Sequence, residues 1–386
     1  MGENKRYKKA LSLEGAIFLA IFIGFFCLLG SKMGTTNMFR TMMNTAYDLL
    51  VNTVLYIVAI AVVAGAISGL LSEFGVISII NKLLSPLMKP LYDLPGAASV
   101  GVVTTYLSDN PAILTLAKDK GFRRYFKKYQ IPALTNIGTA FGMGLIVTTV
   151  LMTQNAPQGE NFVAAALIGD LGAIIGSIVS TRLMLIFTKK KYGKEQWALE
   201  ECAVTDDLIN YREIRSGNVG QRALDAMLEG GKAGVEMGAS IIPGVLIICT
   251  LVIMLTNGPS EAGVYTGAAK EGVGVLTYIG EKLSFILNPL FGFKSAEAIA
   301  FPITSLGAVG AALSLVPSLL SKGLIGGNEI AVFTAMGMCW SGYLSTHVAM
   351  MDALECRELT GKAILSHTIG GLFAGIAAHF IYILLI

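Results

Sequence analysis

The chain has 386 residues, of which 54% are hydrophobic and 14% are charged. A soluble protein carries charge on about a quarter of its residues, so this composition excludes an ordinary soluble domain. Several apolar runs reach the ~20 residues that a helix needs to cross ~30 Å of hydrocarbon. We therefore predict an all-α polytopic protein of the bacterial plasma or inner membrane. The net charge of +3 identifies no partner by itself, and we expect no nucleic-acid partner.

The N-terminal segment 1–46 is basic at its start and then apolar from Ala10 to Gly30. A signal peptide would also begin this way, but the apolar run is long and lacks a convincing small-residue cleavage site. We predict a cytoplasmic N-terminus, a first transmembrane helix and a short outer loop over residues 31–46.

The first half of the chain, residues 47–188, contains an apolar stretch, 97–117, that Ser108-Asp109-Asn110-Pro111 interrupts at its middle. Proline removes a backbone donor and disfavours helical angles in the residue before it. The amphipathic segment 75–92 before this stretch indicates a helix along the inner interface. The basic run 118–129 after it marks the cytoplasmic side. Because both ends are then cytoplasmic, we predict a re-entrant hairpin with these polar residues at its tip.

Full crossings of the first half are predicted at 47–71, 130–152 and 162–187. The polar segment 189–232 is interpreted as a cytoplasmic, part-helical linker. The second half, 233–386, repeats the plan, with three crossings, an amphipathic segment and a second re-entrant hairpin at 296–316. The other elements of this half are placed at 235–255, 272–293, 329–351 and 364–386.

Comparison of the chain with itself at a shift of about 200 residues gives an ordered series of matches. Ala97 falls on Ala296, and Leu107-Ser108 at the first tip falls on Leu306-Gly307. The helices that follow align at the same shift, with matches of Thr135 to Thr334, Gly138 to Gly337 and Phe141 to Trp340. Any single match can arise by chance, whereas an ordered series of matches over most of each half indicates a duplicated unit.

The predicted topology makes the two structural repeats inverted, because each half has three full crossings and one hairpin. The positive charges agree with this topology. Only six of the 29 Lys and Arg residues fall on its outer side, as the positive-inside rule requires. With the extra N-terminal transmembrane helix, the chain has seven crossings and an external C-terminus.

Segment 69–110, GLLSEFGVISIINKLLSPLMKPLYDLPGAASVGVVTTYLSDN, resembles the nucleoside-recognition, or Gate-domain, integral membrane proteins. The resemblance is best over SPLMKPLYDLPG and extends less clearly through 133–147. The C-terminal half is more weakly similar to ethanolamine-permease-type proteins. The resemblance implies an architecture similar to that of concentrative nucleoside transporters, with two re-entrant hairpins and two broken helices around a central site. It does not imply a nucleoside as substrate, because Gate domains also occur in an iron permease and in spore-maturation proteins.

The candidate site is formed by the two hairpin tips and by the helices that face them. Polar side chains in these segments would contact a solute near the bilayer midplane. Trp340 could stack on a planar substrate, although packing is the commoner role of such an aromatic residue. The predicted substrate-binding residues are Thr105, Ser108, Asp109, Asn110, Thr135, Asn136, Thr139, Thr304, Ser305, Gly307, Thr334, Trp340, Ser341 and Tyr343.

Three ionisable residues are candidates for coupling an ion: Asp109, Asp170 and His347. An ionisable side chain inside a membrane is costly unless it meets a partner, water or an ion. His347 titrates near neutral pH in its ordinary state, but it could equally be a packing residue. The three histidines lie on different predicted helices and the five cysteines have no metal or redox spacing, so no metal or cofactor is expected.

These features predict a secondary active transporter of a small polar organic solute, nucleoside-like or amine-like, coupled to H⁺ or Na⁺. One alternative is a passive channel or facilitator of the same fold. Another is a non-transporting membrane scaffold or signalling protein that acts through the linker 189–232. No catalytic constellation is visible, so an enzyme is not expected. We also expect a homo-oligomer, either a dimer or a trimer.

Overall fold

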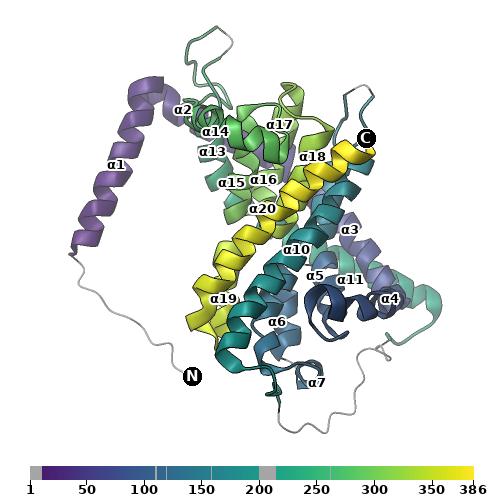
Figure 1. Cartoon of the computed structure of the whole chain (residues 1–386). Helices are drawn as coiled ribbons and strands as arrows, with labels where there is room; N and C mark the ends of the chain where they lie inside the picture. The colour runs from purple at the N-terminus through teal and green to yellow at the C-terminus, as the bar shows by residue number, and fades with distance from the viewer. Residues whose placement is uncertain (1–10, 109–110, 119, 158, 200–213, 261) are drawn as a thin grey trace.

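The computed structural model describes residues 11–108, 111–118, 120–157, 159–199, 214–260 and 262–386, which form a bundle of helices (Figure 1). No strand is found in these ranges, and the β contact in them is an isolated bridge between Lys127 and Trp197. Within the same ranges, six helical stretches are long and apolar enough to cross a membrane. They are Leu13–Met33, Thr35–Glu73, Lys128–Met152, Phe162–Tyr192, Val219–Thr256 and Arg357–Leu385. The predicted multi-pass, all-helical membrane protein is confirmed.

Helix α1 (Leu13–Met33) stands apart from the rest of the bundle in Figure 1. The Ser12 side chain accepts a hydrogen bond from the backbone N–H of Gly15 and so caps the first turn. The helix ends at Gly34, whose φ of 78° glycine adopts without strain. Most of α1 is exposed and apolar, as expected of a helix that faces lipid.

The predicted outer loop over 31–46 is wrong, because helix α2 (Thr35–Asp48) occupies most of it. α2 continues through a π-helical turn (Leu49–Val54) into α3 (Leu55–Glu73). Two of its polar residues, Thr41 and Thr45, are buried and bond to the loop that contains residues 270 and 271. Thr41 donates to Glu271, and Thr45 accepts from the backbone N–H of Lys270 at 2.8 Å. Lys270 and Glu271 lie far along the chain from α2, so no local sequence pattern predicts these contacts.

The first half contains the predicted interfacial helix and the two arms of the predicted hairpin. These are α4 (Val76–Tyr92), α5 (Ala98–Leu107) and α6 (Pro111–Lys118). The expected crossing at 130–152 is interrupted after Thr139, which divides it into two helices. The remaining elements are α7 (Lys120–Arg123), the 3₁₀ turn η2 (Lys128–Gln130), α8 (Ala133–Thr139), α9 (Gly144–Met152) and α10 (Phe162–Tyr192).

α11 (Val219–Ser240) starts within the expected part-helical linker 189–232 and continues into the second half. Residues 200–213 of that linker lie outside the described residues. The expected crossing at 329–351 is also broken, into α18 (Gly327–Cys339) and α19 (Tyr343–Ala353). The other elements are α12 (Ile242–Gly244), η3 (Val245–Cys249), α13 (Thr250–Thr256), α14 (Val275–Phe291), η4 (Ala296–Ile299), α15 (Ala300–Gly307), α16 (Val309–Leu313), α17 (Val316–Ser321), η5 (Arg357–Leu359) and α20 (Thr360–Leu385).

Backbone turns recur at matching places in the two halves. Both interfacial helices start after a left-handed glycine, Gly75 before α4 and Gly274 before α14. Both end at a left-handed residue, Asp93 (φ 56°) and Gly292 (φ 65°). Both broken helices also restart after a left-handed residue, Met143 and Gly342. In every pair the second residue follows the first by the same number of residues, so the periodicity of the sequence extends to the backbone.

Two glycine-lined crossings join the first half to the second. In the crossing of α3 with α11, a Cβ atom built on Gly65 would lie 2.3 Å from the carbonyl oxygen of Gly230. In the crossing of α10 with α20, a Cβ atom on Gly176 would lie 2.5 Å from the carbonyl oxygen of Gly370. α10 and α20 lie side by side across the bundle in Figure 1. Small residues let the backbones approach this closely, which is how membrane helices gain packing energy.

We predict that Gly65→Ala destabilises the protein, although alanine favours a helix over glycine by about 1 kcal/mol. The added methyl group must displace the backbone of α11, and overpacking of this kind costs about 1–3 kcal/mol. The thermal unfolding midpoint of the purified protein measures the effect. The matched control is Gly24→Ala on α1, where nothing lies within 4 Å of the added atom. Equal midpoints for the two variants would contradict a close α3–α11 contact.

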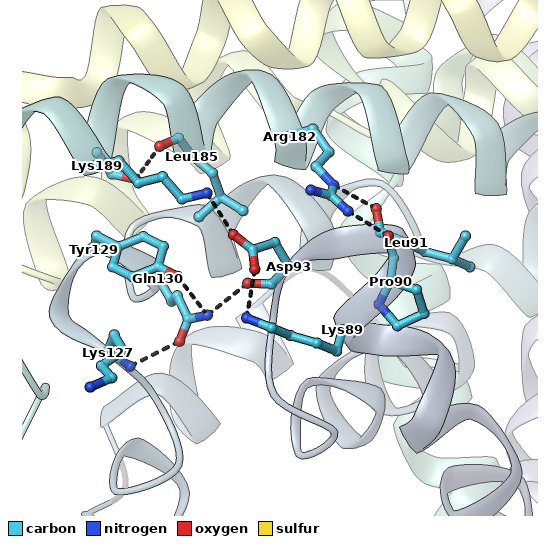
Figure 2. A network of polar contacts seen from close by, with 11 residues as sticks. Lys89, Pro90, Leu91, Asp93, Lys127, Tyr129, Gln130, Arg182, Leu185 and Lys189 are labelled. Carbon is cyan, nitrogen blue, oxygen red and sulfur yellow. Dashed lines mark hydrogen bonds and ion pairs between the residues drawn. The ribbon is translucent and has the colours of Figure 1, made fainter. Parts of the chain in front are cut away.

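A polar network fixes the end of α4 to α10 on the side of the basic segments (Figure 2). The Asp93 carboxylate accepts from Lys89 and Lys189, each at 2.6 Å, and the Asp93 backbone carbonyl accepts from Gln130 at 2.7 Å. Arg182 donates to the backbone carbonyls of Pro90 and Leu91. The last turn of a helix leaves its carbonyls unpaired, so this arginine from α10 completes the end of α4.

The charge of Asp93 contributes to stability. Its partial burial raises the carboxyl pKa, but the hydrogen bonds from Lys189 and Lys89 outweigh burial and hold the pKa below its usual value. A carboxyl whose pKa is lower in the folded than in the unfolded protein stabilises the fold above the unfolded value, about 3.9, and loses this contribution as pH falls.

We predict that Asp93→Asn lowers the free energy of unfolding by about 1 kcal/mol at pH 7, the size expected for a partly exposed ion pair. The difference between variant and parent should shrink below about pH 4, where the parent carboxyl is protonated. Denaturant unfolding at pH 7, 5 and 3.5 measures it, with Asp225→Asn on the exposed face of α11 as the control. A difference that does not change with pH would show that Asp93 acts without its charge.

Candidate functional site

The tips of both hairpins are places where the chain stops one helix and starts another inside the bundle. α5 ends at Leu107, Ser108 is non-helical and α6 starts at Pro111, where the missing N–H of proline costs nothing. α15 ends at Gly307, and Ala308 is extended before α16. Asp109 and Asn110 lie outside the described residues, so their roles as substrate-binding and ion-coupling residues stay predictions.

Each hairpin packs on the broken helix of its own half. A Cβ atom on Gly138 of α8 would lie 2.4 Å from Ile113 on the second arm, and one on Gly144 would lie 2.3 Å from Tyr106 on the first arm. In the second half the backbone N–H of Gly342, at the helix break, donates to the Ser305 carbonyl at 3.1 Å. The structure thus brings each hairpin against the broken helix of its own half.

Most of the predicted hydroxyl groups are buried and donate within their own helix. Thr105 donates to the Gly101 carbonyl, and Ser305 donates to the Pro302 carbonyl. Thr135, Thr304 and Thr334 do the same with Pro132, Ala300 and Ile330. Thr139 contacts the Met350 sulfur at 3.9 Å, and Ser341 is buried. The hydroxyl hydrogens of the five residues that donate within their helices are therefore used in this conformation, and the lone pairs of these hydroxyl oxygens are left for a solute.

Asn136 belongs to a buried hydrogen-bond chain that the sequence did not reveal. Its amide Nδ2 donates to Ser180 Oγ at 3.0 Å on α10 and to the Ala363 carbonyl at 3.1 Å on α20. Ser180 Oγ lies 2.9 Å from His367 Nδ1, and His367 Nε2 reaches the Cys339 carbonyl at the break of α18. A carbonyl can only accept, so Nε2 carries the hydrogen, and Nδ1 of the neutral ring accepts from Ser180.

His347 and Trp340 lie beside this chain. The His347 ring is 4.6 Å from the His367 ring, and its Nδ1 donates to the Tyr343 carbonyl at 3.1 Å. Its other nitrogen, Nε2, is buried and has no hydrogen-bond partner among the described residues. Trp340 packs on Gly371 and on the ring of Tyr343, whose hydroxyl bonds to Thr368 at 2.6 Å. Trp340 is therefore a packing residue in this conformation.

Asp170 connects the first hairpin to the crossing helices. Thr148 of α9 donates to Asp170 Oδ1 at 2.7 Å, and Tyr106 of α5 donates to Oδ2 at 3.3 Å. The carboxylate therefore lies among three elements of the first half. Its two donors were absent from the residues selected by sequence, because only the tertiary structure brings them to Asp170.

A cavity of about 350 Å³ reaches the first hairpin tip. Ser108 and Thr104 line it from the hairpin, Ser68 and Ser72 from α3, and Arg215 and Glu229 from the α11 end of the linker. Of the predicted site residues, Ser108 lines this cavity. Gly307, at the second tip, does not line it; a Cβ atom added to Gly307 would lie near Ile248 of η3. The two tips do not share this cavity.

Ion pairs surround the charged end of this cavity. Glu73, at the end of α3, is buried and accepts from Arg215 Nη1 and Arg222 Nε, both at 2.6 Å. Arg215 also pairs with Glu229 at 2.5 Å. Arg215, Arg222 and Glu229 belong to the segment 189–232 that the sequence indicates as a cytoplasmic linker, and only the tertiary structure places residues 214–222 against α3.

We predict that Ser180→Ala lowers the free energy of unfolding by about 1–3 kcal/mol, because it leaves the buried Nδ1 of His367 without its donor. Denaturant unfolding of the purified protein measures this. Ser345→Ala removes an exposed hydroxyl from the same region and is the matched control. Combining Ser180→Ala with Asn136→Ala should cost less than the two single losses together, because both act on one chain of bonds. Additive losses would contradict a connected network.

No protein-family model matches the chain. An uncharacterized protein of Alkalihalophilus pseudofirmus is 22% identical over 302 residues, which are 73% of this chain and 58% of that protein. The chain thus matches less than two thirds of the length of this curated relative.

Solved structures of CNTnw resemble the whole chain. CNTnw in an inward-facing, substrate-bound state superposes with a TM-score of 0.57 at 13% sequence identity, covering 96% of this chain and 84% of that chain. A CNTnw variant in an outward-facing state gives the same score and identity and covers 96% and 85%. At this identity the likeness shows the fold alone. It agrees with the architecture that the resemblance of segment 69–110 implies.

Proposed function

We propose that the chain is a secondary active transporter that moves a small polar organic solute, nucleoside-like or amine-like, across a bacterial plasma membrane. The observation that carries the proposal is the cavity of about 350 Å³ that reaches the first hairpin tip within a CNTnw-like fold. Helix ends inside a membrane protein typically orient ions and polar solutes. The N-terminus is proposed to be cytoplasmic, and the assembly to be a homodimer or homotrimer.

The proposed mechanism rests on two halves of inverted topology, 47–188 and 233–386, joined by the linker 189–232 and preceded by segment 1–46. Three observations support it. Backbone turns recur at matching places, each hairpin packs on its own broken helix, and the long crossings pair α3 with α11 and α10 with α20. Motion of the hairpins against α3 and α11 would then expose the site to one side at a time.

The driving ion is proposed to be H⁺ or Na⁺, bound with Asp109 at the first tip. The cavity leads to Ser108, the residue before Asp109, so an ion that enters it arrives at this segment. Asp170 and His347 are the further candidates. Asp170 is held by donors from the hairpin and the broken helix, and His347 has a buried, unpaired nitrogen.

Uptake into proteoliposomes tests the proposal. Radiolabelled uridine, adenosine and ethanolamine are supplied under an inward Na⁺ gradient, an inward H⁺ gradient or neither. We predict that at least one of these solutes accumulates above its external concentration under one of the gradients. Asp109→Asn should lower that accumulation roughly tenfold or more, because it removes a charge from an embedded ion site while keeping its shape.

The control variant is Asp225→Asn on the exposed face of α11, which should accumulate solute normally. Uptake that stops at equilibrium under every gradient would identify a passive channel. Normal accumulation in the Asp109→Asn variant would remove Asp109 from the site. Absence of uptake for a wide panel of polar solutes, with correctly folded protein, would favour a scaffold or signalling role.

A further inference from the structure

A second cavity lies between the first hairpin and the interfacial helix α4. Its volume is about 470 Å³, within the range of about 300–1,000 Å³ that ligand pockets occupy. Apolar side chains form nearly all of its wall, among them Leu84 and Leu87 of α4, Val103 of α5 and Ile174 of α10. Leu87 and Ile174 are exposed, so the cavity opens at the apolar outside of the bundle.

One charged group stands in this apolar wall. Of the residues that line the cavity, all within the described part of the chain, Asp170 alone is an acid or a base of full charge. Thr148 and Tyr106 each donate one hydrogen bond to it. Each carboxylate oxygen can accept hydrogen bonds from two donors, so each oxygen of Asp170 can accept one more hydrogen bond. No salt bridge to Asp170 is formed by the described lysines, arginines or histidines.

Aromatic rings stand near the carboxylate. Tyr92, Tyr106 and Phe141 line the same cavity, and the Tyr92 hydroxyl is already bonded to Ser177 at 2.8 Å. Aromatic faces attract organic cations, and a carboxylate attracts them more strongly where little water screens the charge. The apolar remainder of the wall favours an apolar body and disfavours a solute rich in hydroxyl groups.

We infer that this cavity is a binding site for a protonated lipophilic amine, with the ammonium group at Asp170 and the apolar body against α4 and α5. Leu107 and Leu145 line both this cavity and the one at the hairpin tip, so the two spaces are neighbours divided by these side chains. An amine in the cavity contacts α5, the arm that carries the tip. This cavity differs from the one at the hairpin tip, it shares Asp170 with the candidates for ion coupling, and amine binding to it does not require transport.

Three probes of one shape and different charge test the inference: benzylamine, benzyl alcohol and benzoate. Their binding to the full-length protein in lipid nanodiscs is measured by isothermal titration calorimetry at pH 7.5, with empty nanodiscs subtracted. Benzylamine should bind roughly tenfold or more tightly than benzyl alcohol, the gain expected from a charge-assisted hydrogen bond, and benzoate should bind least. Asp170→Asn should remove this preference, while Asp225→Asn should keep it.

A second variant covers the case in which Asp170→Asn fails to fold. Ile174→Trp places a larger side chain at the rim of the cavity, one helical turn from Asp170 on α10, and should weaken benzylamine binding by roughly tenfold or more. Equal affinity of the parent protein for benzylamine and benzyl alcohol would overturn the inference, because the cavity would then bind apolar molecules without regard to their charge. Unchanged benzylamine binding in Ile174→Trp would overturn it too, since the amine would be bound elsewhere. No solute gradient is present, so the result is independent of the transport assay.

Discussion

The structure depends on one constraint, which is that a backbone N–H or C=O group inside a bilayer needs a partner. Irregular backbone is tolerated at membrane depth only where protein or a polar cavity surrounds it. This chain stops helices within the bundle at two hairpin tips and two helix breaks. The buried helices α8 and α18 carry these breaks, and long crossings surround them. The position of every irregular segment in the interior follows from that requirement.

The long helices can surround the breaks because their contact surfaces are small. Glycines allow α10 to lie against α20 and α3 against α11 at backbone distance. Apolar side chains gain little from leaving lipid, so close packing and buried hydrogen bonds stabilise membrane helices instead. The chain Asn136–Ser180–His367–Cys339 connects helices of both halves at one of these crossings. Glycine and a few buried polar side chains thus perform the task that a hydrophobic core performs in a soluble protein.

Polar residues of the interior fall into two groups. One group, including Thr105 and Thr334, returns its hydrogen to the helix that bears it. The other group connects separate elements, as Asp170 does through Tyr106 and Thr148. The bonds of the second group hold the first hairpin to the broken helix and to α10. The cavities on either side of Leu107 both border α5, so the first hairpin is the element at which the two cavities meet.

The sequence alone determined the membrane class, the hairpin positions and the period of the repeat. Those features follow from local physics: apolar length, proline beside polar residues, and similar residues at a fixed shift. It could not place the breaks at Ala140 and Trp340, the start of α11 at Val219, or the helix α2, because each depends on contacts far along the chain. Only the tertiary structure determined two further contacts. They are the hydrogen bond between Ser180 and His367 and the salt bridges of Glu73 with Arg215 and Arg222. A hydrogen bond between residues nearly half the chain apart leaves no local pattern, because only the crossing angle and depth of two helices bring its atoms within reach.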